Sequence, residues 1–145
     1  MNQQAPDLVI GPLAITVHGY QFGEAHNEWD ANWLFVTAVC DADGARVRVS
    51  GSILSTGDFA GFAKQCEELH RELKGEAVLD PLEPELRVLL RYTNKAGDLE
   101  GRVQITPDNM SQRHEYTFGL DQSYLPSVIA QCRRVLERFP VRAMS

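Results

Sequence analysis

Hydrophobic and polar residues alternate along several short stretches of the chain, which is typical of β-strands with one buried face. Residues 13–20 alternate in this way. Residues 33–40 are apolar at nearly every position, which predicts a central strand buried on both faces. After a turn-forming Asp-Ala-Asp-Gly sequence, residues 45–54 alternate again, with valines on one side and Arg46 and Arg48 on the other. The pattern therefore predicts three strands before residue 55.

Two other stretches have apolar residues three and four positions apart, which is the spacing of amphipathic helices. The first begins at Ser55, which with Asp58 predicts a capping box, and Gly75 predicts its left-handed end. The second covers residues 123–139, with Pro126 in its first turn, where the missing amide leaves no hydrogen bond unmade. Each helix has one apolar stripe, so each is expected to pack on a sheet.

The patterns of the remaining segments predict further strands. Residues 76–85 contain two prolines, which predicts an extended segment at a sheet edge. Residues 86–92 and 99–106 form the next predicted hairpin, and the alternation at 114–120 predicts the last strand. Residues 1–12 are expected to be a loose N-terminal lead-in.

This order of elements predicts an α+β fold with an antiparallel sheet of about six strands and two amphipathic helices packed on one face. A length of 145 residues suits one domain, residues 1–145, and no internal repeat is evident. The opposite face of the sheet would then be open.

Composition narrows the class of protein. With 43% hydrophobic and 23% charged residues the chain is ordinary for a globular protein, and its apolar runs are too short to span a membrane. The N-terminus lacks the basic and apolar regions of a signal peptide, so we expect a cytoplasmic protein of bacterial type, with three reduced cysteines. The net charge of −6 argues against direct nucleic-acid binding.

No pattern of catalytic or metal-binding residues is present. The four histidines are scattered without a zinc-ligand spacing, and the nucleophile-elbow and glycine-rich phosphate motifs are missing. We therefore predict no catalytic residue, no metal and no cofactor, and favour a binding protein over an enzyme.

Arginine has an unusual distribution. Most arginines within the predicted strands oppose the apolar positions, so they should project from the open face of the sheet. They either pair with cross-strand acids such as Glu100 and Glu115, or recognise acidic groups on a partner, with Arg48 and Arg91 as candidate binding residues. The six strand arginines are Arg46, Arg48, Arg87, Arg91, Arg102 and Arg113.

The only two tryptophans lie four positions apart. Trp33 begins the most apolar strand and is expected in the core. Trp29 lies in a polar loop, where it either folds back as a lid over the sheet or stays exposed. Exposed and surrounded by Glu24, Glu28 and Asp30, it would be an anchor for a basic partner.

Four sequence blocks occur in order between about residues 13 and 141. They are Gly19-Tyr20-Gln21-Phe22, Trp29-Asp30-Ala31-Asn32-Trp33-Leu34, Leu73-Lys74-Gly75-Glu76-Ala77 and Leu120-Asp121-Gln122-Ser123-Tyr124-Leu125-Pro126. Together they resemble the WapI family of bacterial immunity proteins. The resemblance implies a small cytoplasmic antidote that binds a cognate polymorphic toxin domain and blocks it without catalysis. Nucleases are among the toxins of the family, and an acidic inhibitor suits a basic nuclease cleft.

Two alternatives from other classes remain at this point. One is a self-associating scaffold protein that dimerises through Phe35 and the arginines of the open sheet face. The other is a small ligand-binding enzyme, which would need a deep pocket with convergent polar groups.

Overall fold

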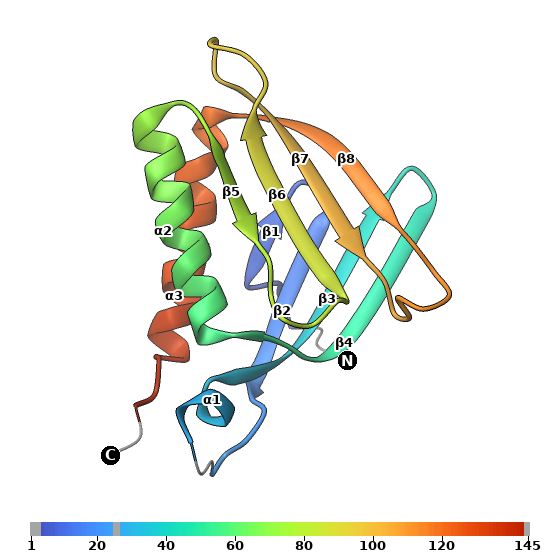
Figure 1. Ribbon diagram of the computed structural model, residues 1–145, viewed down its shortest axis with the longest axis vertical. Coiled ribbons are helices and arrows are strands. Elements are labelled where there is room, and N and C mark those ends of the chain that lie inside the picture. Colours follow the sequence, from blue (N-terminus) through green and yellow to red (C-terminus); the bar gives the residue numbers. More distant parts are fainter. Residues whose placement is uncertain (1–3, 25–26, 144–145) are drawn as a thin grey trace.

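The computed structural model describes residues 4–24 and 27–143. A unit of four strands followed by a long helix occurs twice in succession along the chain, and Figure 1 shows the arrangement of these elements. The first unit ends in helix α2 and the second in helix α3, which follows a short 3₁₀ helix, η1. A single helical turn, α1, lies in the loop between the second and third strands. The bounds are β1 Leu8–Ile10, β2 Leu13–Tyr20, α1 Glu28–Ala31, β3 Trp33–Ala42, β4 Ala45–Ser55, α2 Thr56–Glu72, β5 Glu76–Leu79, β6 Leu86–Tyr92, β7 Asp98–Ile105, β8 Glu115–Asp121, η1 Gln122–Tyr124 and α3 Leu125–Arg138.

The strands form two antiparallel sheets of four, which we call sheet I (β1–β4) and sheet II (β5–β8). The α+β class is confirmed, but the prediction of one sheet of about six strands is wrong. Alternation along a strand shows which face is buried and does not show whether that face meets a helix or another sheet. Here the chain leaves sheet I through α2 before it begins sheet II, so β4 and β5 do not pair.

The two sheets pack with their buried faces toward each other, and the two long helices lie along one side of them (Figure 1). Helix α2 packs against α3 and β5, while α3 also packs against β1. The helices therefore cover the side at the β1 and β5 edges. The prediction that both helices would pack on one face of a single sheet is wrong. One buried cluster joins both sheets and both helices, with Val36, Phe59, Val88 and Cys132 among its members.

Strand β1 lies within the residues that were expected to form a loose lead-in. Leu8 and Ile10 are fully buried, and the Val9 amide donates to Oε1 of Gln131 on α3 at 2.8 Å. Asp7 accepts a hydrogen bond from the Val17 amide at 2.7 Å. The bond to Gln131 bridges more than a hundred positions of sequence, so a three-residue strand is stable here although its local pattern is weak.

The ends of α2 follow the predicted chemistry with one difference. The Ser55 hydroxyl accepts from the Asp58 amide at 3.1 Å, and the Asp58 carboxylate accepts from the Ser55 amide at 2.8 Å, which confirms the capping box. The left-handed residue at the C-cap is Leu73, with φ of 57°, two positions before Gly75. Gly75 is also left-handed, with φ of 94°, and leads the chain into β5.

The ring of Phe118 packs at the contact between the two sheets, which we call the seam. Phe118 on β8 lies opposite Gly101 on β7, and a Cβ atom at Gly101 would overlap its ring. The same ring lies against Gly11, in the turn between β1 and β2. A side chain at either glycine would push the ring out of the seam, so the contact between the sheets depends on both glycines.

Candidate partner-binding surface

The loop between β2 and β3 carries α1, which is fixed at its start by Asn27. The Asn27 side-chain oxygen accepts from the Asp30 amide at 2.8 Å, which is an N-cap bond. A single turn cannot be stable through its own hydrogen bonds, because helix nucleation is unfavourable. Its position must therefore come from contacts with the rest of the chain.

Asn32 makes the central contacts at the end of α1. Its amide nitrogen donates to the Glu28 carbonyl at 2.8 Å and to the Arg142 carbonyl at 2.9 Å. Its amide oxygen accepts from the Thr56 hydroxyl and from the Arg142 amide, each at 2.8 Å. All four hydrogen-bonding positions of this side chain are used. Asn32 thus connects α1, the start of α2 and the C-terminal segment.

Arg142 holds the same loop from the C-terminal side. Its guanidinium donates to the carbonyls of Ala31 and Phe22, each through a bond of 2.8 Å, and to that of Gly23 at 3.3 Å. The guanidinium carbon also lies 3.8 Å from the centroid of the Tyr20 ring. Burial raises the pKa of the Tyr20 hydroxyl, and the charge of Arg142 opposes that rise. The loop is therefore tied to residues more than a hundred positions away in sequence.

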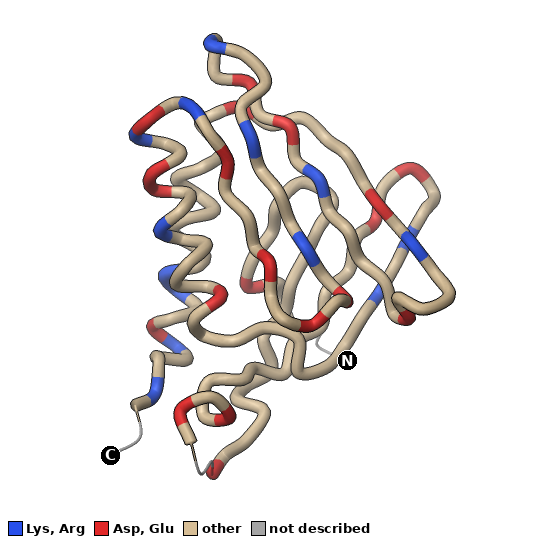
Figure 2. The backbone as a smooth tube through the Cα atoms, viewed as in Figure 1, with Lys and Arg blue, Asp and Glu red and all other residues tan. Residues whose placement is uncertain are grey.

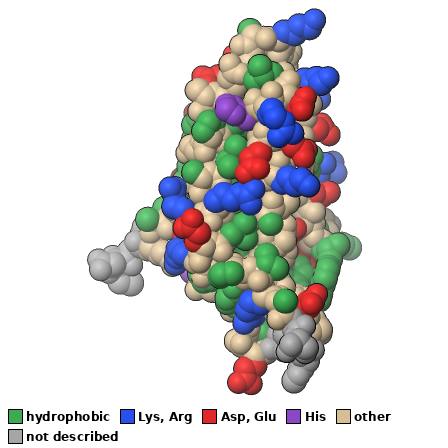
Figure 3. All heavy atoms as spheres, turned by 90° about the vertical axis from the view of Figure 1, so that its left-hand side faces the viewer, with side chains coloured by type: hydrophobic (Ala, Val, Ile, Leu, Met, Phe, Trp, Pro, Cys, Tyr) green, Lys and Arg blue, Asp and Glu red, His purple; other side chains and the backbone are tan. Residues whose placement is uncertain are grey.

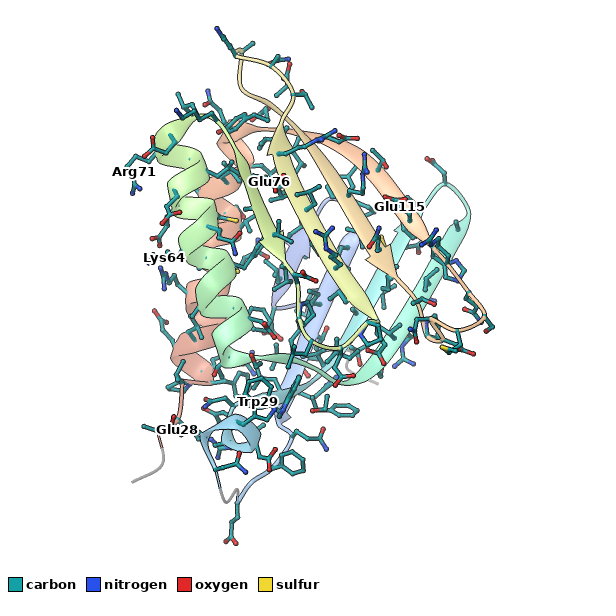
Figure 4. The ribbon with its side chains drawn as sticks, viewed as in Figure 1. Glu28, Trp29, Lys64, Arg71, Glu76 and Glu115 are labelled. Carbon is teal, nitrogen blue, oxygen red and sulfur yellow. The ribbon has the colours of Figure 1, made fainter. Side chains whose placement is uncertain are left out.

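A hollow of about 280 Å³ lies between α1, the start of α2 and the C-terminal segment. Figure 4 shows Trp29 and Glu28 projecting from α1 beside it. We call this hollow the tryptophan groove. It is lined by Glu28, Trp29, Asn32, Trp33, Ser55, Thr56, Gly57, Asp58, Leu82 and Val141.

The walls of the tryptophan groove are largely apolar. Trp29 is 62% exposed and meets Trp33 edge to face, with ring centroids 6.0 Å apart. Leu82 and Val141 are 72% and 59% exposed. Three of the large apolar side chains that the fold leaves exposed therefore converge here, which is typical of an interaction site. Figure 3 shows a hydrophobic patch at the lower right of the helical side.

Both tryptophans differ from the simplest interpretation of the sequence. Trp29 does not fold back over the sheet, so the exposed alternative is the one the structure supports. Trp33 is only half-buried and lines the groove, although we predicted it in the core. It lies at the first position of β3, where a β-bulge in the pairing with β4 follows between Leu34 and Phe35.

Two carboxylates supply the charge of the groove. Glu28 and Asp58 are the charged residues among its lining residues. Burial raises the pKa of Asp58, while hydrogen bonds from Ser55 lower it and the nearby Asp80 raises it further. Figure 2 shows acidic positions in α1 and in the loop before it. The groove thus combines apolar walls with negative charge.

A family model described as the immunity protein WapI-like family matches residues 9–140. The chain belongs to this WapI-like immunity protein family. No curated protein is significantly similar to it in sequence. Among solved structures, the crystal structure of WHY3 from Arabidopsis thaliana is similar at a TM-score of 0.47 and 13% identity, over 89% of this chain and 83% of that chain.

In this WapI-like protein the six residues predicted to bind a partner do not form one surface. Glu28, Trp29 and Asp30 lie together in α1, and Glu24 lies exposed in the loop before it. Arg48 is exposed between two buried valines on β4, so it projects from the outer face of sheet I. Arg91 is on β6, in sheet II. The arginines were expected to share one open face, and the division into two sheets separates them.

Two arginines of sheet II pair with cross-strand acids, as one of the two interpretations of the sequence predicted. Arg91 lies 3.0 Å from Glu100 on the neighbouring strand β7, and Arg102 lies 3.4 Å from Glu115 on β8. Arg102 also lies 3.3 Å from Glu100 on its own strand. Hydrogen bonds from Arg91 and Arg102 lower the pKa of Glu100. These side chains are therefore occupied within the sheet.

The outer face of sheet I is different in character. Phe35 is 40% exposed there, with its ring centroid 5.5 Å from that of His18. Arg48 has no ion-pair partner among residues 4–24 and 27–143. Arg113 precedes β8 and is not in a strand, contrary to our prediction. The dimer surface proposed from the sequence would thus contain Phe35 and Arg48 without the arginines of sheet II.

Sequence reasoning found Trp29 and its acidic neighbours but missed Arg142, and it did not predict that Asn32 would bond Thr56 and the C-terminal segment. No local pattern predicts these long-range contacts. Within the described ranges no group of three or more metal-binding side chains comes together, and no helix has the length and apolar character needed to cross a bilayer.

Proposed function

We propose that this protein is a non-catalytic immunity protein that binds a cognate polymorphic toxin domain and neutralises it by occupying its surface. Membership of the WapI-like immunity family supports the general role. The observation that carries the proposal is the tryptophan groove, where an exposed Trp29 is presented on a loop held by Asn32 and Arg142.

The hydrogen bonds that hold α1 in place favour binding. Aromatic side chains at the centre of a protein interface contribute most when they are already held in the bound position, since little conformational entropy is then lost. Hydrogen bonds from Asn32 and Arg142 hold both ends of α1, so Trp29 starts from a fixed backbone. An exposed tryptophan in a free loop would not have this advantage.

The charge around Trp29 fits a basic toxin domain, such as a nuclease that binds phosphate groups. Glu28 and Asp30 flank it in α1, Glu24 lies in the loop before α1, and the whole chain has a net charge of −6. Complementary charge accelerates association and selects partners. In this proposal the protein acts in the bacterial cytoplasm, where it meets the toxin before the toxin reaches nucleic acid.

Co-expression tests the function. The gene for this protein and the toxin domain encoded beside it are induced together in a bacterial host, and growth and complex formation are measured. We expect the unaltered protein to protect the host. Trp29→Ala should bind the toxin domain at least about tenfold more weakly and should no longer protect the host. Met110→Ala is a matched control, because Met110 is an 89% exposed apolar side chain in the loop between β7 and β8.

Circular dichroism shows that the Trp29→Ala variant is folded before it is tested. Failure of the unaltered protein to protect the host or to bind the toxin domain contradicts the proposed function. Equal loss of protection with Met110→Ala contradicts the assignment of the binding surface to the tryptophan groove.

A further inference from the structure

We propose that the tryptophan groove receives an arginine side chain of the partner protein, with its aliphatic stem against the apolar walls and its guanidinium at Glu28 and Asp58. This inference rests on the proposed function, because it names the chemistry that the same surface recognises. It identifies a class of contact that family membership does not supply.

The size of the groove suits one side chain. Its volume is about 280 Å³, close to the lower end of the range of about 300–1,000 Å³ that is usual for small-molecule pockets, and large enough for one long side chain. Its walls come from several separate segments, namely α1, the start of β3, the start of α2, the loop after β5 and the C-terminal segment. A single long side chain can lie between these segments, and its stem would cover the apolar surfaces of Leu82 and Val141.

The charges select a cationic occupant. No lysine, arginine or histidine is among the residues that line the groove, and both charged lining residues are acidic. An apolar occupant would cover the Glu28 carboxylate and Oδ1 of Asp58, whose Oδ2 already accepts from Ser55. Burial of charge without a cationic partner is unfavourable. An acidic occupant would be repelled. A cationic occupant pairs with the carboxylates, so it leaves no buried charge unpaired and is not repelled.

The tryptophans favour arginine over lysine. A planar guanidinium stacks on an indole face and is more weakly hydrated than an ammonium group, so it is more readily buried at an interface. It can also donate to a carboxylate through two parallel bonds. The edge-to-face arrangement of Trp29 and Trp33 leaves two indole surfaces nearly at right angles, at an interplanar angle of 84°.

The protein's own nearby arginine does not fill this role. Arg142 donates to backbone carbonyls of Phe22, Gly23 and Ala31, and its guanidinium lies over the Tyr20 ring. It is not among the residues that line the groove, although its neighbour Val141 is. Arg142 therefore does not occupy the groove, where Glu28 and Oδ1 of Asp58 can meet a cation from outside while Oδ2 of Asp58 accepts from Ser55.

Peptide titration tests the inference without the toxin. Acetyl-Gly-Arg-Gly-amide is added to the ¹⁵N-labelled full chain, and the two indole N–H signals are followed by NMR. Parallel titrations use peptides with citrulline, lysine or norleucine in place of arginine. Citrulline has nearly the shape of arginine without its charge, so the comparison isolates the cation.

We expect the arginine peptide to shift both indole signals and to bind roughly threefold to tenfold more tightly than the citrulline peptide. Glu28→Gln should remove most of that difference. Glu68→Gln, which changes an exposed acid on α2, should leave it unchanged. Citrulline, lysine or norleucine binding as tightly as arginine overturns the inference, and so does the absence of any shift with the arginine peptide.

This result and the co-expression result are separable. If the arginine peptide binds as expected and the host is not protected, the proposed function fails and the chemistry of the groove stands. If protection depends on Trp29 and the peptides show no preference for arginine, the function stands and this inference is overturned.

Discussion

The guanidinium of Arg142 lies 3.8 Å from the centroid of the Tyr20 ring and donates hydrogen bonds to the carbonyls of Phe22 and Ala31, near the two ends of the loop that follows Tyr20. This one side chain joins the end of β2, α1 and the C-terminal segment. The loop that carries Trp29 contains a single helical turn, so its position depends on the contacts of Arg142 and on the hydrogen bonds that Asn32 makes to Glu28 and Arg142.

Replacing Arg142 with alanine should loosen the loop while the sheets remain intact. The change removes the bonds to Phe22 and Ala31 and the stacking on Tyr20, so we expect the free energy of unfolding to fall by about 1–3 kcal/mol. Hydrogen exchange at the amides of α1 should increase more than exchange in β3. Equal exchange in both elements would show that Arg142 does not hold the loop. Arg134→Ala, at an exposed position of α3, is the control.

Asn32→Ala should be more damaging, because it leaves several groups without partners. The Thr56 hydroxyl is buried and donates to the Asn32 side chain, and the Arg142 amide donates to the same oxygen. We expect a loss of roughly 2–4 kcal/mol in the free energy of unfolding, measured by urea denaturation. Asn109→Ala, in the exposed loop between β7 and β8, should change stability by less than about 0.5 kcal/mol. A small effect of Asn32→Ala would contradict the central role of this side chain.

Gly101→Val should destabilise the contact between the sheets. A β-branched side chain at this position meets the Phe118 ring, which cannot move without leaving the seam. We expect a loss of about 1–3 kcal/mol, the usual result of overpacking, as a lower midpoint of thermal or urea unfolding. Gly119→Val is the matched control, since Gly119 is on neighbouring β8 and a Cβ atom there would have no neighbouring atom within 4 Å among the described residues. Similar losses in both variants would place the effect in the strand and not in the Phe118 contact.

The pH dependence of stability should carry a signature of Asp58. Burial raises its pKa in the folded protein, although hydrogen bonds from Ser55 oppose the rise. The folded state therefore binds the proton more tightly than the unfolded chain, where an aspartate has a pKa of about 3.9. The contribution of Asp58 to stability is greatest below that value and falls as the pH rises through the raised pKa.

Asp58→Asn should remove this dependence, because asparagine keeps an oxygen that accepts from Ser55 and does not titrate in this range. Urea denaturation of both proteins from about pH 3 to pH 7 measures the difference in their free energies of unfolding. We expect the unaltered protein to lose stability relative to Asp58→Asn as the pH increases. A constant difference, or one of opposite sign, would contradict the raised pKa.

Local patterns predicted most elements well. The strand at Leu86–Tyr92 has the expected bounds, and the Ser55–Asp58 capping box is present where the spacing placed it. These features depend on neighbours two to four positions away, which the sequence displays directly. Trp29 was recognised as a candidate for the same reason, since an apolar residue among Glu24, Glu28 and Asp30 stands out in sequence.

The sequence alone therefore determined the positions of most strands and helices, the acidic loop around Trp29 and the polar side of each strand. Only the tertiary structure decided that the strands form two sheets, that Arg48 and Arg91 belong to different ones, and that Leu8–Ile10 is a strand. It also decided that Trp33 lines a groove whose frame comes from Asn32 and Arg142. The physical reason is range: periodicity records which side of an element is buried, whereas its partner is chosen by contacts between residues far apart in the chain.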